Sequence, residues 1–357
     1  MARFQILSLI GGGIRGAFIT SYLKELEDKL GQPIAEKFDL IAGTSTGGII
    51  AAGLACGLTA NDMHNFYSDH GASIFNPRPD YKAKGLNKFL FPMVNWAFKN
   101  RTGKNFDEIF RSRFCPNTLE KAIKIGMSGK TLGDIKCTRL IMPAVNLTKG
   151  GPHVFRSTHL PKAHRDKDIL VTDAILATTA APTFFPPKII NGNSYVDGGV
   201  WSSDPSMLAV AEAIRIQQFE KKLDPESSSL TNNLHLLSVG TGVSKYSLAP
   251  KGDDAGMLFW ASKIGNLMSN VQSQGVHLPL KFILQDRYQH VNFEMQEKWE
   301  MDDVSHIPDL FEIGKNRADE TFDKVNEEFF QHEPSCFVPF QSTKGEISLD
   351  GFMVPQG

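Results

Sequence analysis

The N-terminal part of the chain alternates between short apolar segments and longer helical patterns, and this alternation constrains the fold more than any other feature. Phe4 to Ile10 is an apolar run typical of a buried strand, and Phe38 to Ala42 is a second one. Between them, apolar residues recur at helical spacing from Phe18 to Leu30, and Gly31 is well placed to end that helix. Another helix is predicted from Ile49 to Cys56. Strands that alternate with helices predict a parallel sheet with helices on its faces.

Later segments extend this pattern. Strands are predicted at Arg139 to Val145, Ser194 to Val196 and Leu234 to Val239, and a helix at Asp173 to Thr179. The prolines of Ala181 to Pro187 predict a rigid extended segment. Towards the end of the chain, apolar residues at helical spacing predict a helix packed into the core. They are Met257, Trp260, Ile264, Leu267, Met268 and Val271.

Charge and cysteine usage narrow the functional classes. The 38 basic and 39 acidic residues give a net charge of −1, which provides no overall field to attract a nucleic acid polymer. The four cysteines form no CxxC pair, so neither a zinc site nor a disulfide framework is indicated, and no metal or other cofactor is predicted. The N-terminus lacks a basic stretch followed by an apolar run, and glycines interrupt the most apolar window, Ile41 to Leu58. We therefore expect a cytoplasmic protein without a signal peptide or membrane span.

Gly43-Thr44-Ser45-Thr46-Gly47 carries the strongest chemical signal. It has the form GxSxG and falls between a predicted strand and a predicted helix, the context in which this motif presents a nucleophilic serine on a sharp turn. Gly43 and Gly47 supply the room that such a turn needs. Ser45 also lies at the start of a helix, where the helix dipole favours developing negative charge. Ser45 is therefore the predicted nucleophile.

Gly11-Gly12-Gly13-Ile14-Arg15-Gly16 matches the GxGxxG pattern of dinucleotide-binding folds. Those folds place an acidic residue at the end of the second strand, where it binds the ribose. Here the acidic residue, Asp39, lies near the start of that strand, and the strand runs into the Ser45 turn. The sequence favours a different use, in which the backbone N–H groups of Gly11, Gly12 and Gly13 form an oxyanion hole.

Asp197-Gly198-Gly199 follows a predicted strand and supplies the candidate base. A free aspartate has a pKa of about 3.9, which makes it a poor acceptor for the proton of a serine hydroxyl. Asp197 can act as the base only if burial raises its pKa. The prediction therefore requires a dry, partly apolar site.

In this order, the three motifs resemble those of the patatin-like phospholipases. Two further segments resemble the family as well, Ala180 to Pro186 and Ser238 to Gly242, so the resemblance spans most of the chain. It implies a three-layer α/β/α fold with a mostly parallel central sheet. It also implies one domain over residues 1–357, with a catalytic core at about 4–242 and a helical C-terminal part at about 243–357.

The resemblance also implies roles for individual residues. Ser45 and Asp197 would form a dyad of nucleophile and base that needs no histidine. The N–H groups of Gly11, Gly12 and Gly13 would form the oxyanion hole, and Arg15 matches the basic position of the glycine motif. The remaining motif glycines are Gly16, Gly43, Gly47, Gly198 and Gly199.

The implied reaction is the hydrolysis of fatty-acyl esters of membrane phospholipids at the inner face of the membrane. Some bacterial members of the family, the CapV type, are similar in size and are phospholipase effectors of antiphage defence that cyclic dinucleotides switch on. The resemblance therefore makes a cyclic dinucleotide a candidate activator, although no residue indicates a nucleotide site. It leaves open whether copies of the chain form a homo-oligomer.

Two alternatives remain. An ordinary α/β-hydrolase would use a Ser–Asp–His triad, and His235, His277 and His290 follow the aspartate in the required order. A relative without activity would only bind lipid or a protein partner. Separately, the basic and aromatic residues of 76–104 predict either a membrane-facing lid over the nucleophile or a pair of helices that covers the sheet.

Overall fold

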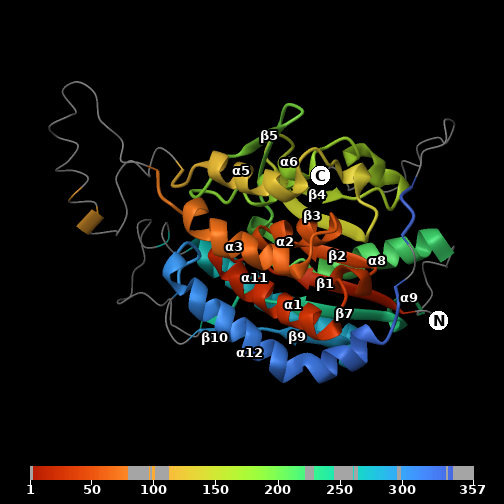
Figure 1. Ribbon diagram of the computed structural model, residues 1–357. Coiled ribbons are helices and arrows are strands. Elements are labelled where there is room, and N and C mark those ends of the chain that lie inside the picture. Colours follow the sequence, from red (N-terminus) through yellow and green to blue (C-terminus); the bar gives the residue numbers. More distant parts are fainter. Residues whose placement is uncertain are drawn as a thin grey trace.

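A mixed sheet of eight strands forms the centre of the molecule (Figure 1). The computed structural model describes residues 3–78, 112–221, 229–244, 264–295, 299–334 and 337–340, with short pieces at 96, 99–100 and 260. The predicted lid or helix pair at 76–104 therefore falls mostly outside the described residues.

The strands of this sheet are β1 (Phe4–Leu9), β2 (Leu40–Gly43), β3 (Arg139–Asn146), β4 (Gly151–Arg156), β5 (Lys188–Ile190), β6 (Asn193–Asp197), β7 (Leu234–Val239) and β9 (Tyr288–Val291). Their order is β5-β6-β3-β2-β1-β7-β9, and β4 pairs with β3 outside that path. The run from β3 to β9 is parallel throughout. β4 and β6 run antiparallel to β3, and β5 runs antiparallel to β6. β8 (Val243–Ser244) and β10 (Glu294–Met295) form a separate parallel pair.

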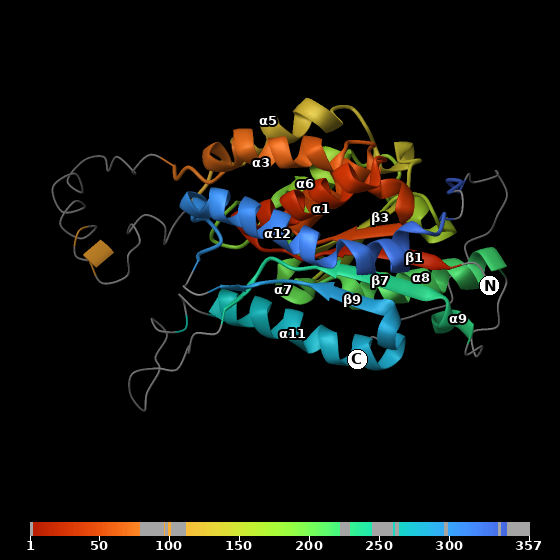
Figure 2. The same ribbon diagram turned by 60° about the horizontal axis from the view of Figure 1, so that its bottom comes forward.

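Helices cover both faces of the sheet. They are α1 (Gly16–Leu30), α2 (Thr46–Ala55), α3 (Ala60–Ile74), α5 (Pro116–Met127), α6 (Val171–Thr178), α7 (Gly199–Ser202), α8 (Ser206–Lys221), α9 (Ser229–Asn232), α11 (Ile264–Leu284) and α12 (Ile307–Val325). Figure 2 shows the sheet between α1 and α12 on one side and α8 and α11 on the other. None of the described helices is both long and apolar enough to cross a lipid bilayer.

Alternation along the strands builds a core on each face. Leu7 and Leu9 of β1 pack with side chains of α1, α2 and α12, whereas Phe4 and Ile6 pack with side chains of α8 and α11. Strands whose side chains are buried on both faces need helices on both faces, which is why the N-terminal strands read as continuous apolar runs. The predicted three-layer α/β fold with a mostly parallel sheet is confirmed.

The N-terminal elements form close to their predicted positions. The order β1, α1, β2, α2 is the predicted one. Gly31 ends α1 in the left-handed conformation, with φ 73°, as its position indicated. The later strands β3, β6 and β7 also form where the apolar runs predicted them.

The prediction of a core stripe towards the end of the chain is wrong. Trp260, Met268 and Val271 are 42, 44 and 59% exposed, although residues from Ile264 onward do form a helix, α11. This helix packs through Leu280 and Leu284 instead, which are fully buried. Periodicity showed that a helix was present but not which side meets the sheet, because α11 is apolar on more than one side.

The C-terminal part departs from its predicted helical make-up as well. β9 extends the central sheet beside β7, and β10 pairs with β8. α12 packs on α1, on the face of the sheet opposite to α8 and α11 (Figure 2). Residues after 243 thus contribute to the sheet and to both of its helical layers.

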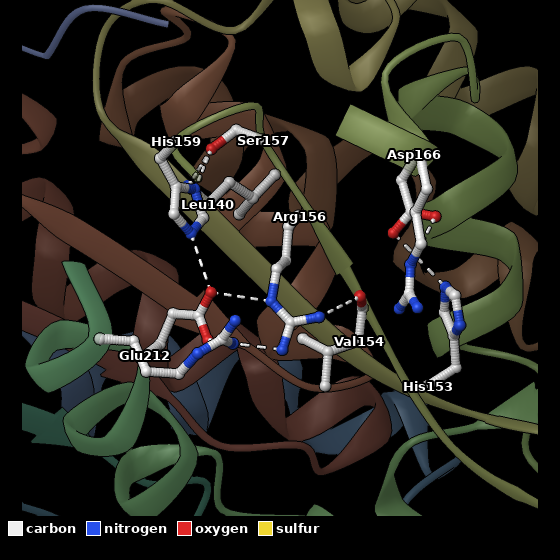
Figure 3. A network of polar contacts seen from close by, with 10 residues as sticks. Leu140, His153, Val154, Arg156, Ser157, His159, Asp166 and Glu212 are labelled. Atoms are coloured by element: carbon white, nitrogen blue, oxygen red, sulfur yellow. Dashed lines mark hydrogen bonds and ion pairs between the residues drawn. The ribbon is translucent and has the colours of Figure 1, made fainter. Parts of the chain in front are cut away.

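A buried ionic network fastens α8 to β4 (Figure 3). The carboxylate of Glu212 accepts hydrogen bonds from Arg156 at 2.8 Å and from Nε2 of His159 at 3.0 Å. Burial alone would raise the pKa of Glu212, but the bond from His159 and the charges of Arg156 and Arg215 outweigh it and bring the pKa to about 2. The pKa of His159 is lowered, chiefly by burial, so a neutral imidazole donates this bond.

Replacing Glu212→Ala should reduce the free energy of unfolding by about 3 kcal/mol, because it leaves the charge of Arg156 without its partner in a mostly buried position. The folded-state pKa of Glu212, about 2, lies below the ordinary 4.5, so this stabilisation is present above about pH 5 and is lost as the pH falls towards 2. Urea unfolding of both proteins at several pH values measures it. Arg215→Ala is the matched control and should change stability by less than about 0.5 kcal/mol, because Arg215 is 44% exposed. Equal losses in the two variants would contradict the assignment.

Candidate active site

The turn between β2 and α2 presents Ser45 on a strained backbone. Ser45 has φ 54° and ψ −121°, and a positive φ in a residue other than glycine persists only where the surroundings hold it. The N–H of Ser45 donates to Oγ1 of Thr178 at 3.2 Å, and Thr178 donates to the carbonyl of Pro143 at 2.6 Å. Thr178, the last residue of α6, therefore ties the turn to α6 and β3.

Close packing allows only glycine on either side of this turn. A Cβ atom at Gly43 would lie 2.2 Å from the carbonyl oxygen of Gly47, and one at Gly47 would lie 2.2 Å from the carbonyl oxygen of Leu9. Real Cβ atoms essentially never approach other heavy atoms within 3.0 Å. Gly43 therefore lets the end of β2 approach the first turn of α2, and Gly47 lets that turn approach the carboxyl end of β1.

Asp197 lies at the end of β6, paired with Ala144 of β3, and is almost fully buried. Its Oδ1 atom accepts the N–H of Gly199 at 2.6 Å, and the side chain of Ser45 lies close enough to its carboxylate to favour the charged form. Burial raises the pKa of Asp197 to about 6, against the opposing effect of these two contacts. The structure thus brings Ser45 and Asp197 together in the dry setting that the sequence argument required.

The glycine loop after β1 lies against the same turn. A Cβ atom at Gly11 would be 3.3 Å from that of Ser45, but the N–H of Gly11 donates to the carbonyl of Ser203 at 3.0 Å and is engaged. Gly12 and Gly13 begin a helical segment that continues into α1. The first N–H groups of a helix have no acceptor within it. Gly12 and Gly13 are therefore better oxyanion donors than Gly11.

Arg15 supports the loop from outside the cavity. It is buried, its Nε–H donates to the carbonyl of Gly12 at 3.2 Å, and its guanidinium contacts the sulfur of Met295 at 3.7 Å. It is not among the residues that line the cavity beside Ser45, so its predicted place at the oxyanion hole stays a prediction. Of the remaining motif glycines, Gly16 begins α1 against Tyr67, and Gly198 lies over the carbonyl of Pro143.

Three residues that no motif predicted hold this arrangement. The carbonyl of Met301 accepts the N–H of Ile14 at 2.8 Å and lies so close to Gly13 (φ 63°) that a Cβ atom there would be 2.1 Å away. Thr178 and Ser203 are the other two, through the bonds to Ser45 and Gly11. Each acts through hydrogen bonds to the backbone of a distant segment, and no local signal in the sequence could have found it.

An apolar cavity of about 240 Å³ opens beside Ser45 and Asp197. The segment Ala181 to Pro187 contributes to its wall, but it forms a turn, with Thr183 at φ 74°, and not the extended structure predicted from its prolines. The apolar lining includes Ile49, Phe66, Ile74, Phe75, Leu119, Phe184, Phe185 and Met268. Such a wall suits a hydrocarbon chain and keeps water from the carboxylate.

The alternatives lack their key residues at this site. His235 pairs with Glu328 at 2.5 Å, and the rings of His277 and His290 lie 3.8 Å apart. Among the described residues, no histidine lines the cavity, and no cluster of side chains could hold a metal ion. Asp39, the acid a dinucleotide fold would need, is buried and accepts the N–H of Gln5 at 2.8 Å.

Comparison with known proteins identifies the family of this chain. The family model of the patatin-like phospholipases matches residues 7–210, which is more than half of the chain. The chain belongs to the patatin-like phospholipase family. It is thus a member of a family of serine hydrolases, as the motifs predicted.

Similar proteins come from bacteria and plants. A cGAMP-activated phospholipase of Vibrio cholerae is 36% identical over 69% of this chain, and the match covers 66% of that relative, slightly less than two thirds. A cGAMP-activated phospholipase of Escherichia coli is 29% identical over 92% of this chain and 86% of its own length. Patatin group D-3 of Solanum tuberosum is 25% identical over 96% of this chain and 90% of its own length.

Replacing Asp197→Asn should stabilise the protein at neutral pH. The folded-state pKa of Asp197, about 6, lies above the ordinary 3.8, so the wild-type protein loses stability as the pH rises from about 4 to above 6. Asparagine has no charge to bury, and its amide oxygen can still accept the N–H of Gly199. The expected gain is on the order of 3 kcal/mol at pH 8 and close to zero at pH 4. Thermal unfolding across this range measures it, and a difference that does not change with pH would contradict the burial argument.

Proposed function

We propose that this protein cleaves fatty-acyl esters of membrane phospholipids through a dyad of Ser45 and Asp197. One observation carries the proposal: the Ser45 side chain interacts with a buried carboxylate with a pKa of about 6, beside an apolar cavity. A base with a pKa near the working pH is both available and strong enough to assist proton transfer. The family membership supplies the substrate class.

The geometry supports an acyl-enzyme pathway. Asp197 accepts the hydroxyl proton while Oγ of Ser45 attacks the ester carbonyl, and the N–H groups of Gly12 and Gly13 stabilise the oxyanion. As the ester bond breaks, Asp197 returns the proton to the departing lysophospholipid oxygen. Water, with Asp197 again accepting a proton, then attacks the carbonyl of the acyl-Ser45 ester. Asp197 passes that proton to Oγ of Ser45 as the bond between Oγ and the acyl carbon breaks, which releases the fatty acid and restores the enzyme. The apolar wall holds the acyl chain during both steps.

Activation by a cyclic dinucleotide is part of the proposal. Two relatives that match this chain bear the name cGAMP-activated phospholipase, and one of them matches over 92% of the chain. Gating of this kind would protect a cell from the enzyme, because uncontrolled hydrolysis of its own phospholipids would damage its membrane.

Fatty-acid release from phospholipid vesicles, with and without cGAMP, tests the function. Ser45→Ala and Asp197→Asn should each reduce release by roughly a thousandfold or more, because each removes one half of a unit that acts together. Asp204→Asn is the matched control, since Asp204 is also buried with a pKa raised to about 6 but does not line the cavity. It should retain activity within roughly tenfold. Undiminished release by Ser45→Ala would overturn the mechanism, and release independent of cGAMP would remove the gating.

The pH profile tests the base separately. With a short-chain ester that dissolves as a monomer, kcat/KM should rise about tenfold per pH unit and level off near pH 6, where Asp197 loses its proton. Asp204→Asn should leave this profile unchanged. A profile that stays flat down to about pH 4 would show that the essential base has an ordinary aspartate pKa.

A further inference from the structure

α11 is apolar on two opposite sides. Leu280 and Leu284 are fully buried against the sheet. The other side exposes a set of large apolar side chains, which we call the outer face: Met268 (44%), Val271 (59%), Leu278 (64%), Phe282 (74%) and Ile283 (40%). Figure 2 shows α11 at the outer surface of the molecule, alongside β7 and β9. A helix that is hydrophobic all round is normally covered all round, so the outer face indicates a second partner.

The outer face reaches the mouth of the active-site cavity. Met268 belongs to both, since it lines the cavity and is 44% exposed. Val200, which is 40% exposed, lines the cavity beside it. Gln272 of α11 donates a hydrogen bond from Nε2 to the carbonyl of Val200 at 2.9 Å, so the two are held together. If a lipid surface lay against α11, an acyl chain could pass from that surface into the cavity without crossing water.

The charges on α11 suit a lipid surface. From Ile264 to Leu284 the helix contains no aspartate or glutamate, and its one lysine, Lys281, is exposed. A carboxylate on this helix would be repelled by anionic headgroups, whereas a lysine beside an apolar face is attracted to them. A glycine, Gly275, lies in the middle of the outer face, and nothing within 4 Å surrounds the position of its Cβ atom.

We propose that α11 is the surface by which this enzyme docks on a phospholipid bilayer. The outer face enters the boundary between headgroups and acyl chains, and the cavity mouth at Met268 and Val200 then opens onto the leaflet. This inference rests on the proposed function for the identity of the substrate. It adds that vesicle hydrolysis depends on side chains that neither touch the dyad nor line the cavity.

Flotation with vesicles of phosphatidylethanolamine and phosphatidylglycerol tests docking, with and without cGAMP. Every protein carries Ser45→Ala, so that no lipid is consumed. The variant Val271→Gln, Leu278→Gln, Phe282→Gln should bind vesicles roughly tenfold more weakly or worse, because it removes the buried apolar area that drives interfacial binding. Its thermal unfolding should match the parent, since all three side chains are mostly exposed.

The matched control is Ile125→Gln, Ile189→Gln, two apolar residues that are 74 and 70% exposed. Ile125 lies on α5, on the opposite side of the molecule from α11 (Figure 2), and Ile189 on β5, at the far edge of the sheet from β9. This control should float like the parent. Equal loss in control and test variants would overturn the proposal, because it would show a general effect of surface apolarity.

Other outcomes also decide the matter. Flotation of the triple variant equal to the parent, or no flotation of the parent in either condition, would overturn docking by α11. Light scattering could also find that the parent is a dimer and the triple variant a monomer. If flotation is then unchanged, the outer face is the contact with a second copy of the chain. Ester hydrolysis is measured separately with the protein that keeps Ser45. If the triple variant loses flotation but the protein with Ser45 hydrolyses no ester, the hydrolase proposal fails and the docking surface stands.

Discussion

The site depends on an aspartate carboxylate, that of Asp197, placed in an apolar cavity. The cavity wall removes water and raises the pKa, whereas the N–H of Gly199 and the hydroxyl of Ser45 lower it, and the balance lies at about 6. With more water, Asp197 would be a weak base; with fewer hydrogen bonds, it would hold its proton at neutral pH. Every other feature of the site maintains this balance or positions the serine next to it.

β3 brings Ser45 and Asp197 together because it pairs with both β2 and β6. β3 pairs Ile141 with Ala42 of β2 and, further along, Ala144 with Asp197 of β6. β3 therefore extends past the end of β2, and the antiparallel β6 returns to the level of the Ser45 turn. A purely parallel sheet would place the carboxyl ends of all its strands at one edge, whereas the antiparallel β6 brings the carboxyl end of a strand, with Asp197, to the Ser45 turn from the opposite direction.

The C-terminal residues complete a site whose motifs all lie before them. The family match ends at residue 210, yet the carbonyl of Met301 supports the glycine loop, and Met268 of α11 lines the cavity. Gln272 of the same helix bonds to Val200, three residues after Asp197. The helix proposed to dock on the membrane thus also borders the cavity and is linked to the segment that follows Asp197.

The sequence by itself determined the strand and helix alternation, the glycines that the elbow requires, and the identity of Ser45 and Asp197 as the candidate pair. These follow from local rules: apolar runs make buried strands, and a turn too tight for a Cβ atom needs glycine at Gly43 and Gly47. Only the tertiary structure decided that the N–H of Gly11 is engaged by Ser203, that Arg15 contacts Met295, and that α11 leaves Val271 and Phe282 exposed. Each of these depends on a partner far away in the chain, and hydrophobic spacing cannot say which side of a helix finds its partner in the same molecule.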